Sequence, residues 1–334
     1  MSTTAAHGHH AAPVDFEPSG ELARVVVFPE PGSVDFRSAS LRRPADDEVV
    51  VETRFSSISA GTERLLFGGK LPGFPQLRFP LVPGYEAAGI VVATGKDVSD
   101  VRVGDEVFVG GAMCYTDVSA AFGGQSSTLI KKATQVVQLH GIPLQQAPLL
   151  ALAATSLHGV ARLGTVAGKR IGVLGMGAIG QFAALFLQAR GARVVVADVR
   201  PERLAGAPGE KIDLSRTTFD AAAYDLDAVV EATGRPEEIA RCARAVRNGG
   251  SIVLLSYYDE LTTPYVDLFV KEVSLLVARE WAHVDLLGAR DAFANRTVDP
   301  SPLAGYVVPI DDYQLAYRTA FDDPTVLKVI LAWA

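Results

Sequence analysis

Residues 170–198 read RIGVLGMGAIGQFAALFLQARGARVVVAD. The apolar run at 171–174 has the length of a buried strand, and glycines follow it directly at 175, 177 and 180. In a dinucleotide-binding turn the first glycine permits the tight bend and the second lets the backbone approach a pyrophosphate. The third lets the next helix pack closely on the strand. The stretch therefore predicts a strand, a phosphate-binding turn and a helix.

The residues after the glycines complete the same unit. An apolar pattern of helical spacing begins at Ala178, and a second strand at 194–197 ends on Asp198. The start of a helix offers free N–H groups to phosphates, and an acid in this place accepts the ribose hydroxyls of NAD and repels the 2′-phosphate of NADP. We predict NAD as the cofactor, although the positive charges of Arg200 and Arg203 weaken the preference for NAD over NADP. The predicted cofactor contacts are Gly175, Gly177, Ala178, Ile179, Gly180, Asp198, Thr233, Gly234 and Ser256.

The composition indicates a soluble α/β protein with two domains. The chain has 334 residues, 49% of them hydrophobic, and a formal net charge of −7, which argues against a nucleic-acid partner. No apolar run approaches the length of a membrane span and no signal-peptide pattern opens the sequence. Because Cys114 and Cys242 form neither a disulfide framework nor a metal-binding pair, we expect a reducing, cytoplasmic location.

The pattern divides the chain into four regions. Residues 1–22, which include several histidines, are expected to be a disordered tail, and residues 23–147 a β-rich domain. Residues 148–280 alternate strands and helices, which predicts a parallel sheet, and residues 281–334 return to the first domain. The expected fold class is α/β, a β-rich domain joined to a doubly wound Rossmann domain. Further strands are expected at 23–27, 48–53, 89–93, 106–109, 228–232, 252–256 and 275–278, helices at 237–246 and 284–294, and a turn at 248–250.

The order of these motifs resembles the medium-chain dehydrogenase/reductase superfamily across residues 23–334. The segments that carry the resemblance are PGYEAAG at 83–89, VGDEV at 103–107, the nucleotide turn, and KVIL at 328–331. The resemblance implies a GroES-like catalytic domain and a homodimer formed through the edge strand of the nucleotide domain. In such an arrangement the substrate lies between the domains, beside the carboxyl ends of the parallel strands.

The chain departs from the zinc-dependent members of that superfamily. The three positions that hold a catalytic zinc in those relatives are occupied here by Ala60, Tyr85 and Ala151, and the cysteine cluster of their structural zinc is missing. A zinc site needs side-chain ligands with lone pairs, which alanine lacks. We therefore predict that the protein uses no metal.

Four further segments resemble the branch of the superfamily that acts in bacteriochlorophyll biosynthesis. They are SAGTERLLF at 59–67, FPLVPGYE at 79–86, FGGQSS at 122–127 and LAAT at 152–155. Enzymes of this branch oxidise the hydroxyethyl arm of a magnesium-containing bacteriochlorin to an acetyl group. The resemblance implies NAD-dependent oxidation of the 3-(1-hydroxyethyl) group of a bacteriochlorophyllide, without catalytic zinc.

Four residues are candidates for the chemistry that zinc performs in relatives. Thr62 stands where relatives keep a proton-relaying hydroxyl, with a helix cap or turn as the alternative. Tyr85 either hydrogen-bonds the substrate oxygen or fills the volume of the lost metal. Glu86 is expected to hold Tyr85 or a backbone group. His158 has a side chain suited to act as a base near neutral pH, with a structural role as the alternative.

The candidate substrate contacts are aromatic and cationic residues of one segment. Phe67, Phe74 and Phe79 belong to a proline-containing stretch and are predicted to stack on a flat macrocycle. Arg64 and Arg78 are predicted to pair with its free propionate. For each residue the alternative is that the aromatic belongs to the core and the cation to the solvated surface.

Two other functions stay open. A zinc-free quinone or enone reductase needs little acid–base chemistry, although such enzymes usually use NADPH, which Asp198 disfavours. The other is a non-catalytic module that binds NAD or a pigment, which needs no acid–base chemistry. The predicted partners are a small-molecule pigment and a second copy of the chain. Peripheral contact with a membrane or with other enzymes of the pathway also stays open.

Overall fold

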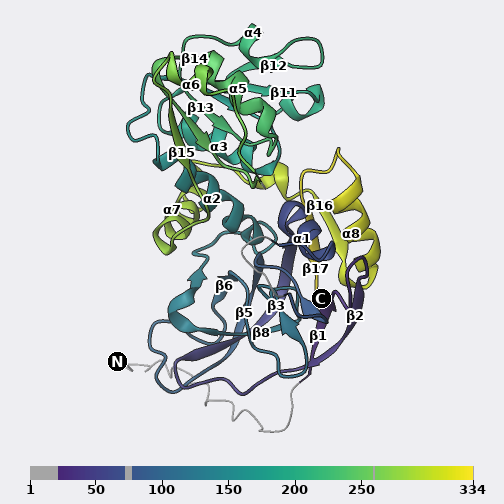
Figure 1. The fold of residues 1–334 in the computed structure, drawn as a ribbon. Helices are drawn as coiled ribbons and strands as arrows, with labels where there is room; N and C mark the ends of the chain where they lie inside the picture. The colour runs from purple at the N-terminus through teal and green to yellow at the C-terminus, as the bar shows by residue number, and fades with distance from the viewer. Residues whose placement is uncertain (1–21, 72–76, 259, 334) are drawn as a thin grey trace, which may run out of the picture.

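The computed structural model describes residues 22–71, 77–258 and 260–333 and contains two main sheets (Figure 1). Six parallel strands form the upper sheet, in the order β12-β11-β10-β13-β14-β15. This is the strand order of a doubly wound dinucleotide-binding domain, which reverses between β10 and β13. Its strands are β10 Arg170–Leu174, β11 Arg193–Asp198, β12 Glu210–Asp213, β13 Leu226–Glu231, β14 Val246–Leu254 and β15 Ser274–Val277, and its helices are α3 Ala178–Ala189, α4 Phe219–Ala222, α5 Pro236–Ala245 and α6 Tyr265–Phe269.

The lower sheet has seven strands and a mixed direction. Its order is β16-β17-β3-β5-β6-β9, with β8 pairing β3, and it packs with two smaller strand pairs, β1-β2 and β4-β7. The strands are β1 Leu22–Val27, β2 Asp35–Ser40, β3 Glu48–Ile58, β4 Leu81–Val82, β5 Ala87–Thr94, β6 Glu106–Val109, β7 Ser119–Ala120, β8 Thr128–Lys132, β9 Val136–Gln138, β16 Tyr306–Pro309 and β17 Val329–Ala332. Two helices accompany it, α1 Ala60–Phe67 and α8 Tyr313–Asp322.

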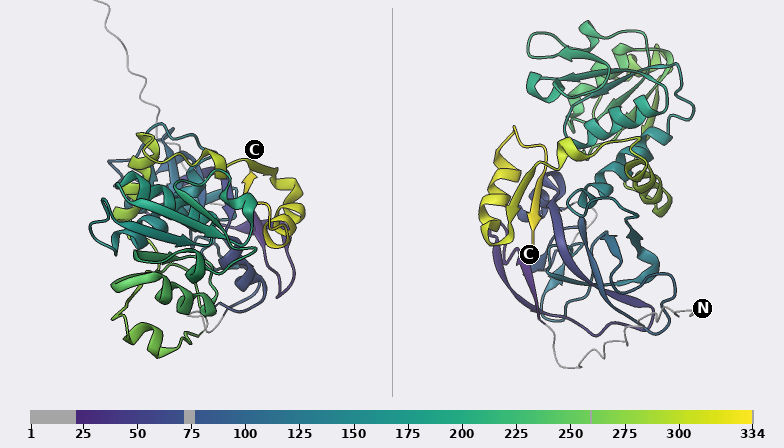
Figure 2. Two further views of the ribbon diagram at one scale, coloured as in Figure 1. Left: turned by 90° about the horizontal axis from the view of Figure 1, so that it is seen from above. Right: turned by 180° about the vertical axis from the view of Figure 1, so that it is seen from behind.

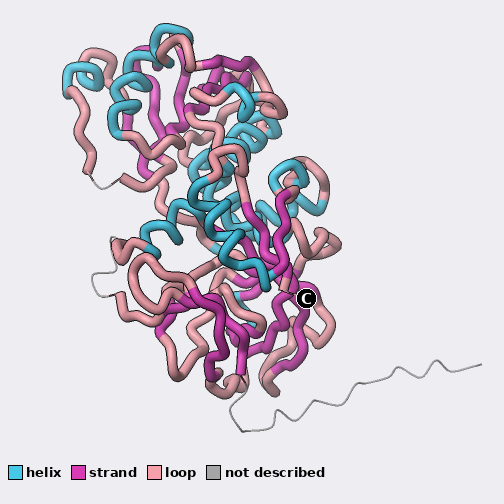
Figure 3. The backbone as a smooth tube through the Cα atoms, turned by 90° about the vertical axis from the view of Figure 1, so that its right-hand side faces the viewer, coloured by secondary structure: helices cyan, strands magenta, loops and turns pink. Residues whose placement is uncertain are grey.

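The end of the chain joins the sheet that its first part forms. Strand β17 pairs antiparallel with β3, with Val329 opposite Ile58, and Figure 2 shows this C-terminal segment beside the N-terminal strands. Helices α2 (Leu150–Ala161) and α7 (His283–Ala294) pack on each other, and Figure 1 shows them between the two sheets. The tube in Figure 3 shows helices in this middle region, with strands above and below them. Among the described residues no helix is both long and apolar enough to cross a bilayer.

The predicted elements are present, with shifted ends and one error. Strand β3 continues five residues beyond the predicted end at 53, to Ile58. The turn predicted at 248–250 is wrong, because these residues lie inside β14, where the pairing passes from Val246 opposite Leu226 to Ser251 opposite Ala228. Gly249 has a φ of +68°, so the glycines accommodate an irregularity in the strand instead of reversing the chain.

Candidate active site

The predicted cofactor residues gather at one edge of the parallel sheet. The glycine turn follows β10, Asp198 ends β11, Gly234 follows β13 and Ser256 follows β14. The carboxyl ends of parallel strands share an edge, and a Cβ on Gly234 would lie 3.5 Å from the Cβ of Ser256. The structure therefore brings together groups that are up to 81 residues apart, counted from Gly175 to Ser256.

Two of the glycines have the roles that their spacing predicts. Gly175 has a φ of +93°, and a Cβ on Gly180 would lie 1.9 Å from the Gly175 carbonyl oxygen, so neither position admits a side chain without strain. A Cβ on Gly177 would meet no atom within 4 Å, which leaves open space outside this backbone. Ala178 and Ile179 then begin α3.

Asp198 also ties the turn to the loop that follows β11. Its carboxylate is buried, Oδ2 accepts a hydrogen bond from the Met176 N–H at 2.7 Å, and Oδ1 accepts one from the Arg200 N–H at 2.9 Å. A guanidinium nitrogen of Arg203 lies 3.9 Å from Oδ2. The acid thus joins the glycine turn to the loop that follows β11.

A second carboxylate at this edge was not predicted from the sequence. Glu231 ends β13, is fully buried, and accepts hydrogen bonds from the Thr233 N–H at 2.8 Å, from the Thr233 hydroxyl and from Tyr258. Burial raises the pKa of Glu231 to about 7, although the bonds from Thr233 lower it. Glu231 fixes the turn that carries Thr233 and Gly234.

Tyr85 forms a cluster of hydroxyl groups, at the position where the resemblance implies a zinc ligand in relatives. Its Oη lies 2.6 Å from Ser59 Oγ and 3.2 Å from Thr62 Oγ1. Thr62 is inside α1 and does not cap it, since Ser59 holds the cap position. Burial raises the pKa of Tyr85 above its usual value, and the nearby charge of Glu86 raises it further, so the phenol stays protonated at physiological pH.

Two aromatic rings enclose the Tyr85 ring. The Phe122 ring meets it edge to face, with centroids 5.1 Å apart, and the Trp281 ring lies 5.6 Å away at an angle of 41°. Trp281 comes from the connection between β15 and α7. It therefore brings the half of the molecule with the parallel sheet into contact with the half with the mixed sheet, a contact that no sequence motif indicated.

Glu86 lies in a buried ion pair and not on Tyr85. Its Oε2 accepts hydrogen bonds from the Ser57 hydroxyl and from the Lys328 ammonium group. Both ionic side chains are almost fully buried, with exposed fractions of 0% for Glu86 and 3% for Lys328. The pair joins the loop before β5 to the C-terminal segment, so the expected bond from Glu86 to Tyr85 or a backbone group is replaced by this one.

Glu63 connects α1 to α8. Its Oε1 accepts a hydrogen bond from the Ser59 N–H at 3.0 Å, and its Oε2 accepts one from the Tyr317 hydroxyl at 2.6 Å. Burial raises the pKa of Glu63 to about 7, although these two bonds lower it. The carboxyl fixes the backbone of Ser59, the residue whose side chain contacts Tyr85.

Replacing Glu63 by glutamine is expected to remove a pH dependence of stability. The pKa of Glu63 rises from its ordinary value of 4.5 to about 7, so its contribution is complete below 4.5 and is lost as the pH rises through about 7. Between pH 5 and pH 8 the unfolding free energy of the wild type should fall by about 2–3 kcal/mol more than that of Glu63→Gln. Urea unfolding at both pH values measures this difference, and parallel pH profiles would contradict it.

His158 is paired with the first turn of α7. Its Nδ1 lies 2.9 Å from Asp285 Oδ2, and 31% of its side chain is exposed. The same Asp285 oxygen accepts a hydrogen bond from the Ala282 N–H at 2.8 Å. The structure thus places His158 between α2 and α7, with one ring nitrogen already engaged.

Most of the predicted substrate contacts have neighbours within the catalytic domain. Phe67 packs edge to face on Phe28 and Phe321, and Phe79 packs in the same apolar cluster. The Arg64 guanidinium lies over the Phe321 ring, 5.3 Å from its centroid. Phe74 lies outside the described residues.

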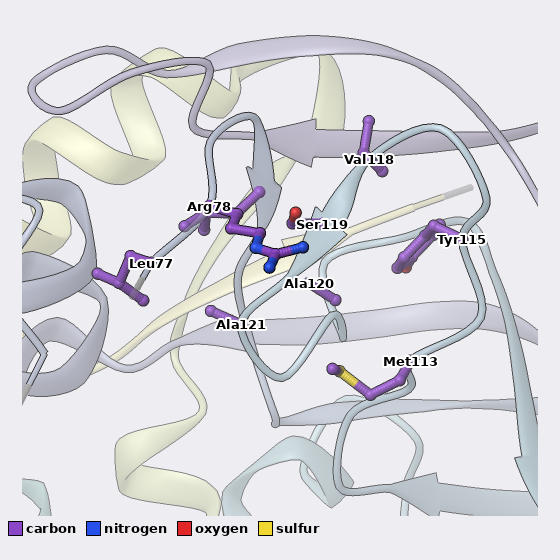
Figure 4. A pocket seen from close by; sticks show the side chains of 9 residues that line it. Leu77, Arg78, Met113, Tyr115, Val118, Ser119, Ala120 and Ala121 are labelled. Carbon is purple, nitrogen blue, oxygen red and sulfur yellow. The ribbon is translucent and has the colours of Figure 1, made fainter. Parts of the chain in front are cut away.

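Arg78 lines a separate pocket of about 310 Å³. Figure 4 shows its side chain reaching into this pocket from one side, with Met113 and Tyr115 on the other. Ser119 and Ala121 also line the pocket, and Ala121 directly precedes Phe122, which packs on Tyr85. The pocket lining is therefore adjacent in sequence to a residue of the Tyr85 cluster, but Tyr85 itself does not line the pocket.

The side chains do not fit a zinc site. Among the described residues no group of three or more His, Cys, Asp or Glu side chains is placed to hold a metal ion. Of the three positions that bind zinc in relatives, Ala60 and Ala151 have no donor atom, and the Tyr85 hydroxyl is engaged with Ser59 and Thr62. Zinc prefers three or four nitrogen, sulfur or carboxylate ligands, and this set supplies none.

Comparisons with known proteins agree with the fold. Residues 45–141 match the alcohol dehydrogenase GroES-like domain, and residues 155–238 match the NAD-binding domain of the D-isomer specific 2-hydroxyacid dehydrogenases. The solved structure of 2R,3R-butanediol dehydrogenase from Bacillus subtilis superposes with a TM-score of 0.83 at 18% identity, over 93% of this chain and 100% of that one.

The relatives found by sequence identify the family within this fold to which the chain belongs. The 2-desacetyl-2-hydroxyethyl bacteriochlorophyllide A dehydrogenase of Cereibacter sphaeroides is 34% identical over 92% of this chain and 97% of its own, and the enzyme of the same name from Rhodobacter capsulatus is 34% identical over 93% and 98%. L-galactonate-5-dehydrogenase of Escherichia coli is 27% identical over 76% of this chain and 82% of its own. The protein is an oxidoreductase that acts on CH–OH groups and has a nicotinamide-nucleotide-binding domain. The chain belongs to the medium-chain dehydrogenase/reductase superfamily, within the family of these bacteriochlorophyllide dehydrogenases.

Proposed function

We propose that the protein oxidises the 3-(1-hydroxyethyl) group of a bacteriochlorophyllide to 3-acetyl, with NAD as the hydride acceptor and without catalytic zinc. The observation that carries the proposal is the Tyr85 hydroxyl cluster at the position of a zinc ligand in relatives. The names of the relatives, matched over nearly the whole chain, supply the substrate class.

The cofactor edge fits a nicotinamide dinucleotide. The open backbone at Gly177 and the N-terminus of α3 would face its pyrophosphate. Asp198 would accept its adenosine ribose hydroxyls, and the turn around Gly234 and Ser256 would lie along it. When bound, NAD supplies the acceptor for the hydride that leaves the alcohol carbon.

Hydroxyl groups carry the proton that leaves the alcohol oxygen. The substrate O–H proton passes to the Tyr85 oxygen while the phenol proton passes to Thr62, 3.2 Å away. Thr62 is half-buried and passes its own proton to water. The raised pKa of Tyr85 disfavours the phenolate form. The phenol therefore gives up one proton as it accepts another and stays neutral during the relay.

The proposal is tested by following cofactor and pigment in one reaction. Purified protein with NAD and 3-hydroxyethyl bacteriochlorophyllide a is expected to form NADH and acetyl product in equal amounts, with the product quantified by chromatography. Consumption of NADPH with a small enone, without pigment oxidation, would support the reductase alternative instead. Pigment binding without turnover under either cofactor would support a binding module.

Asp198→Ala is expected to reduce the preference for NAD. Loss of an acceptor that bonds the ribose should raise the dissociation constant of NADH about tenfold, while NADPH, freed from repulsion, should bind no more weakly than before. Fluorescence titrations measure both constants. Asp213→Ala, at the exposed end of neighbouring β12, is the control and should change neither. An unchanged ratio in Asp198→Ala would exclude the ribose role.

We further propose a homodimer formed through β15. This strand is the edge of the parallel sheet, and it exposes Val277, while α6 exposes Tyr265 and Phe269, with exposed fractions of 62–70%. An apolar sheet edge of this kind is typical of a surface that pairs with another chain. Light scattering should give twice the chain mass for the wild type and a monomer for Val277→Lys. A monomeric wild type would contradict the proposal.

A further inference from the structure

Trp281 places part of an indole surface beside the Tyr85 hydroxyl cluster. Its ring contacts the Tyr85 ring at 5.6 Å, and its Cζ2 would lie 3.7 Å from a Cβ on Gly110. The side chain is half-buried, so it is packed on one part and open on another. It lies after β15, at the same end of the parallel sheet as the cofactor residues.

A largely buried carboxylate holds the backbone next to this tryptophan. Asp285 Oδ2 accepts the N–H of Ala282 at 2.8 Å and lies 2.9 Å from His158 Nδ1. Only 12% of the Asp285 side chain is exposed, and an acid in the first turn of a helix is also stabilised by the helix dipole. The residue after Trp281 is thereby anchored to α7 and, through His158, to α2.

We propose that Trp281 is a specificity-determining residue, the wall on which a flat tetrapyrrole packs, and that Asp285 and His158 are positioning residues that hold it against Tyr85. The inference rests on the proposed function, since it takes the bacteriochlorin as the substrate. The indole is a large aromatic surface, and aromatic stacking favours a flat conjugated ring over a small polyol. A macrocycle packed on the open part of this surface would have its rim beside the Tyr85 hydroxyl.

This assignment changes the expected role of His158. A catalytic base must reach the reacting proton, directly or through one water, whereas the observed Nδ1 contact is with Asp285. Through Asp285 the imidazole acts on the placement of Trp281. Its loss should therefore weaken pigment binding and spare the chemical step.

Trp281→Leu tests the wall. The dissociation constant of 3-hydroxyethyl bacteriochlorophyllide a, measured from the pigment's absorbance, should rise about tenfold to thirtyfold, with a parallel rise in KM. The dissociation constant of NADH should stay within about twofold, which also reports that the fold is intact. Trp281→Phe should recover part of the affinity because it keeps an aromatic face. Trp333→Phe, which alters the other tryptophan, is the control for the dissociation constant of the pigment, which it should leave unchanged.

The two histidine variants test the positioning pair. Asparagine places an amide N–H near the position of Nδ1, so His158→Asn should keep pigment KM within about twofold, whereas His158→Ala should raise it about threefold to tenfold. In both variants kcat should stay within about threefold. A large fall of kcat in both variants with unchanged KM would overturn the positioning role and make His158 a base.

The outcomes separate this inference from the proposed function. If the wild type neither binds nor oxidises the pigment, the proposed function fails, and this inference fails with it. If the wild type oxidises the pigment but Trp281→Leu binds it within about twofold of the wild type, the wall is wrong while the proposed function stands.

Discussion

Tyr85→Phe is expected to lower kcat for pigment oxidation about 10²-fold to 10³-fold. The change removes one hydroxyl, which bonds Ser59 at 2.6 Å and Thr62 at 3.2 Å, and losses of this size are typical when a hydrogen-bonding group at the reacting oxygen is deleted. The ring contacts with Phe122 and Trp281 remain. Folding and NADH affinity should therefore change little. Steady-state kinetics and a thermal melt measure the two effects.

A comparison with another tyrosine makes the result specific. Tyr115→Phe removes a phenol hydroxyl from the same domain, where it donates to the Gly123 carbonyl oxygen at 2.7 Å, and should leave kcat within about threefold. Thr62→Val should reduce kcat less than Tyr85→Phe, because water can replace one relay hydroxyl. If Tyr85→Phe retains the wild-type kcat, the side chain only fills volume.

Lys328→Met is expected to destabilise the protein by about 3–5 kcal/mol. The ammonium group pairs with Glu86, and both side chains are almost fully buried. The variant leaves a carboxylate without its cation, and one oxygen of Glu86 has no hydrogen-bond partner even in the wild type. The unfolding free energy from urea titration measures the loss.

A double variant separates the unpaired charge from the lost packing. Glu86→Gln combined with Lys328→Met removes both charges and should recover about half or more of the lost stability. Lys96→Met breaks an exposed pair with Asp46 and should cost less than about 1 kcal/mol. If Lys328→Met costs as little as Lys96→Met, the buried pair does not hold the C-terminal segment.

The glycine turn is predictable because its signal is local. Gly175, Gly177 and Gly180 lie within six residues, and each follows from the backbone geometry of one strand–turn–helix unit. Glu231 is different: nothing in its own sequence neighbourhood distinguishes an acid that orders a turn from one that faces solvent. Gly249 shows the limit of local signals, because the same residue type serves a turn or a strand irregularity.

The Tyr85 hydroxyl cluster is only partly predictable from the sequence, because its contacts are between residues that are distant along the chain. The substitution of Tyr85 for a metal ligand is visible in the sequence, but its contact with Trp281 depends on how the two domains pack. The bond between Glu63 and Tyr317 joins residues 254 positions apart, and His158 meets Asp285 across 127. Such pairs arise from the tertiary arrangement, and no periodicity indicates them.

Hydride transfer from the alcohol without a metal is tested most directly by metal analysis combined with a turnover assay. Protein dialysed against a strong chelator is analysed for zinc by mass spectrometry and then assayed with NAD and 3-hydroxyethyl bacteriochlorophyllide a. We expect well under one zinc per chain and the same kcat as before dialysis, because Ala60 and Ala151 supply no ligand. Loss of turnover on chelation that returns when zinc is added would contradict the proposal.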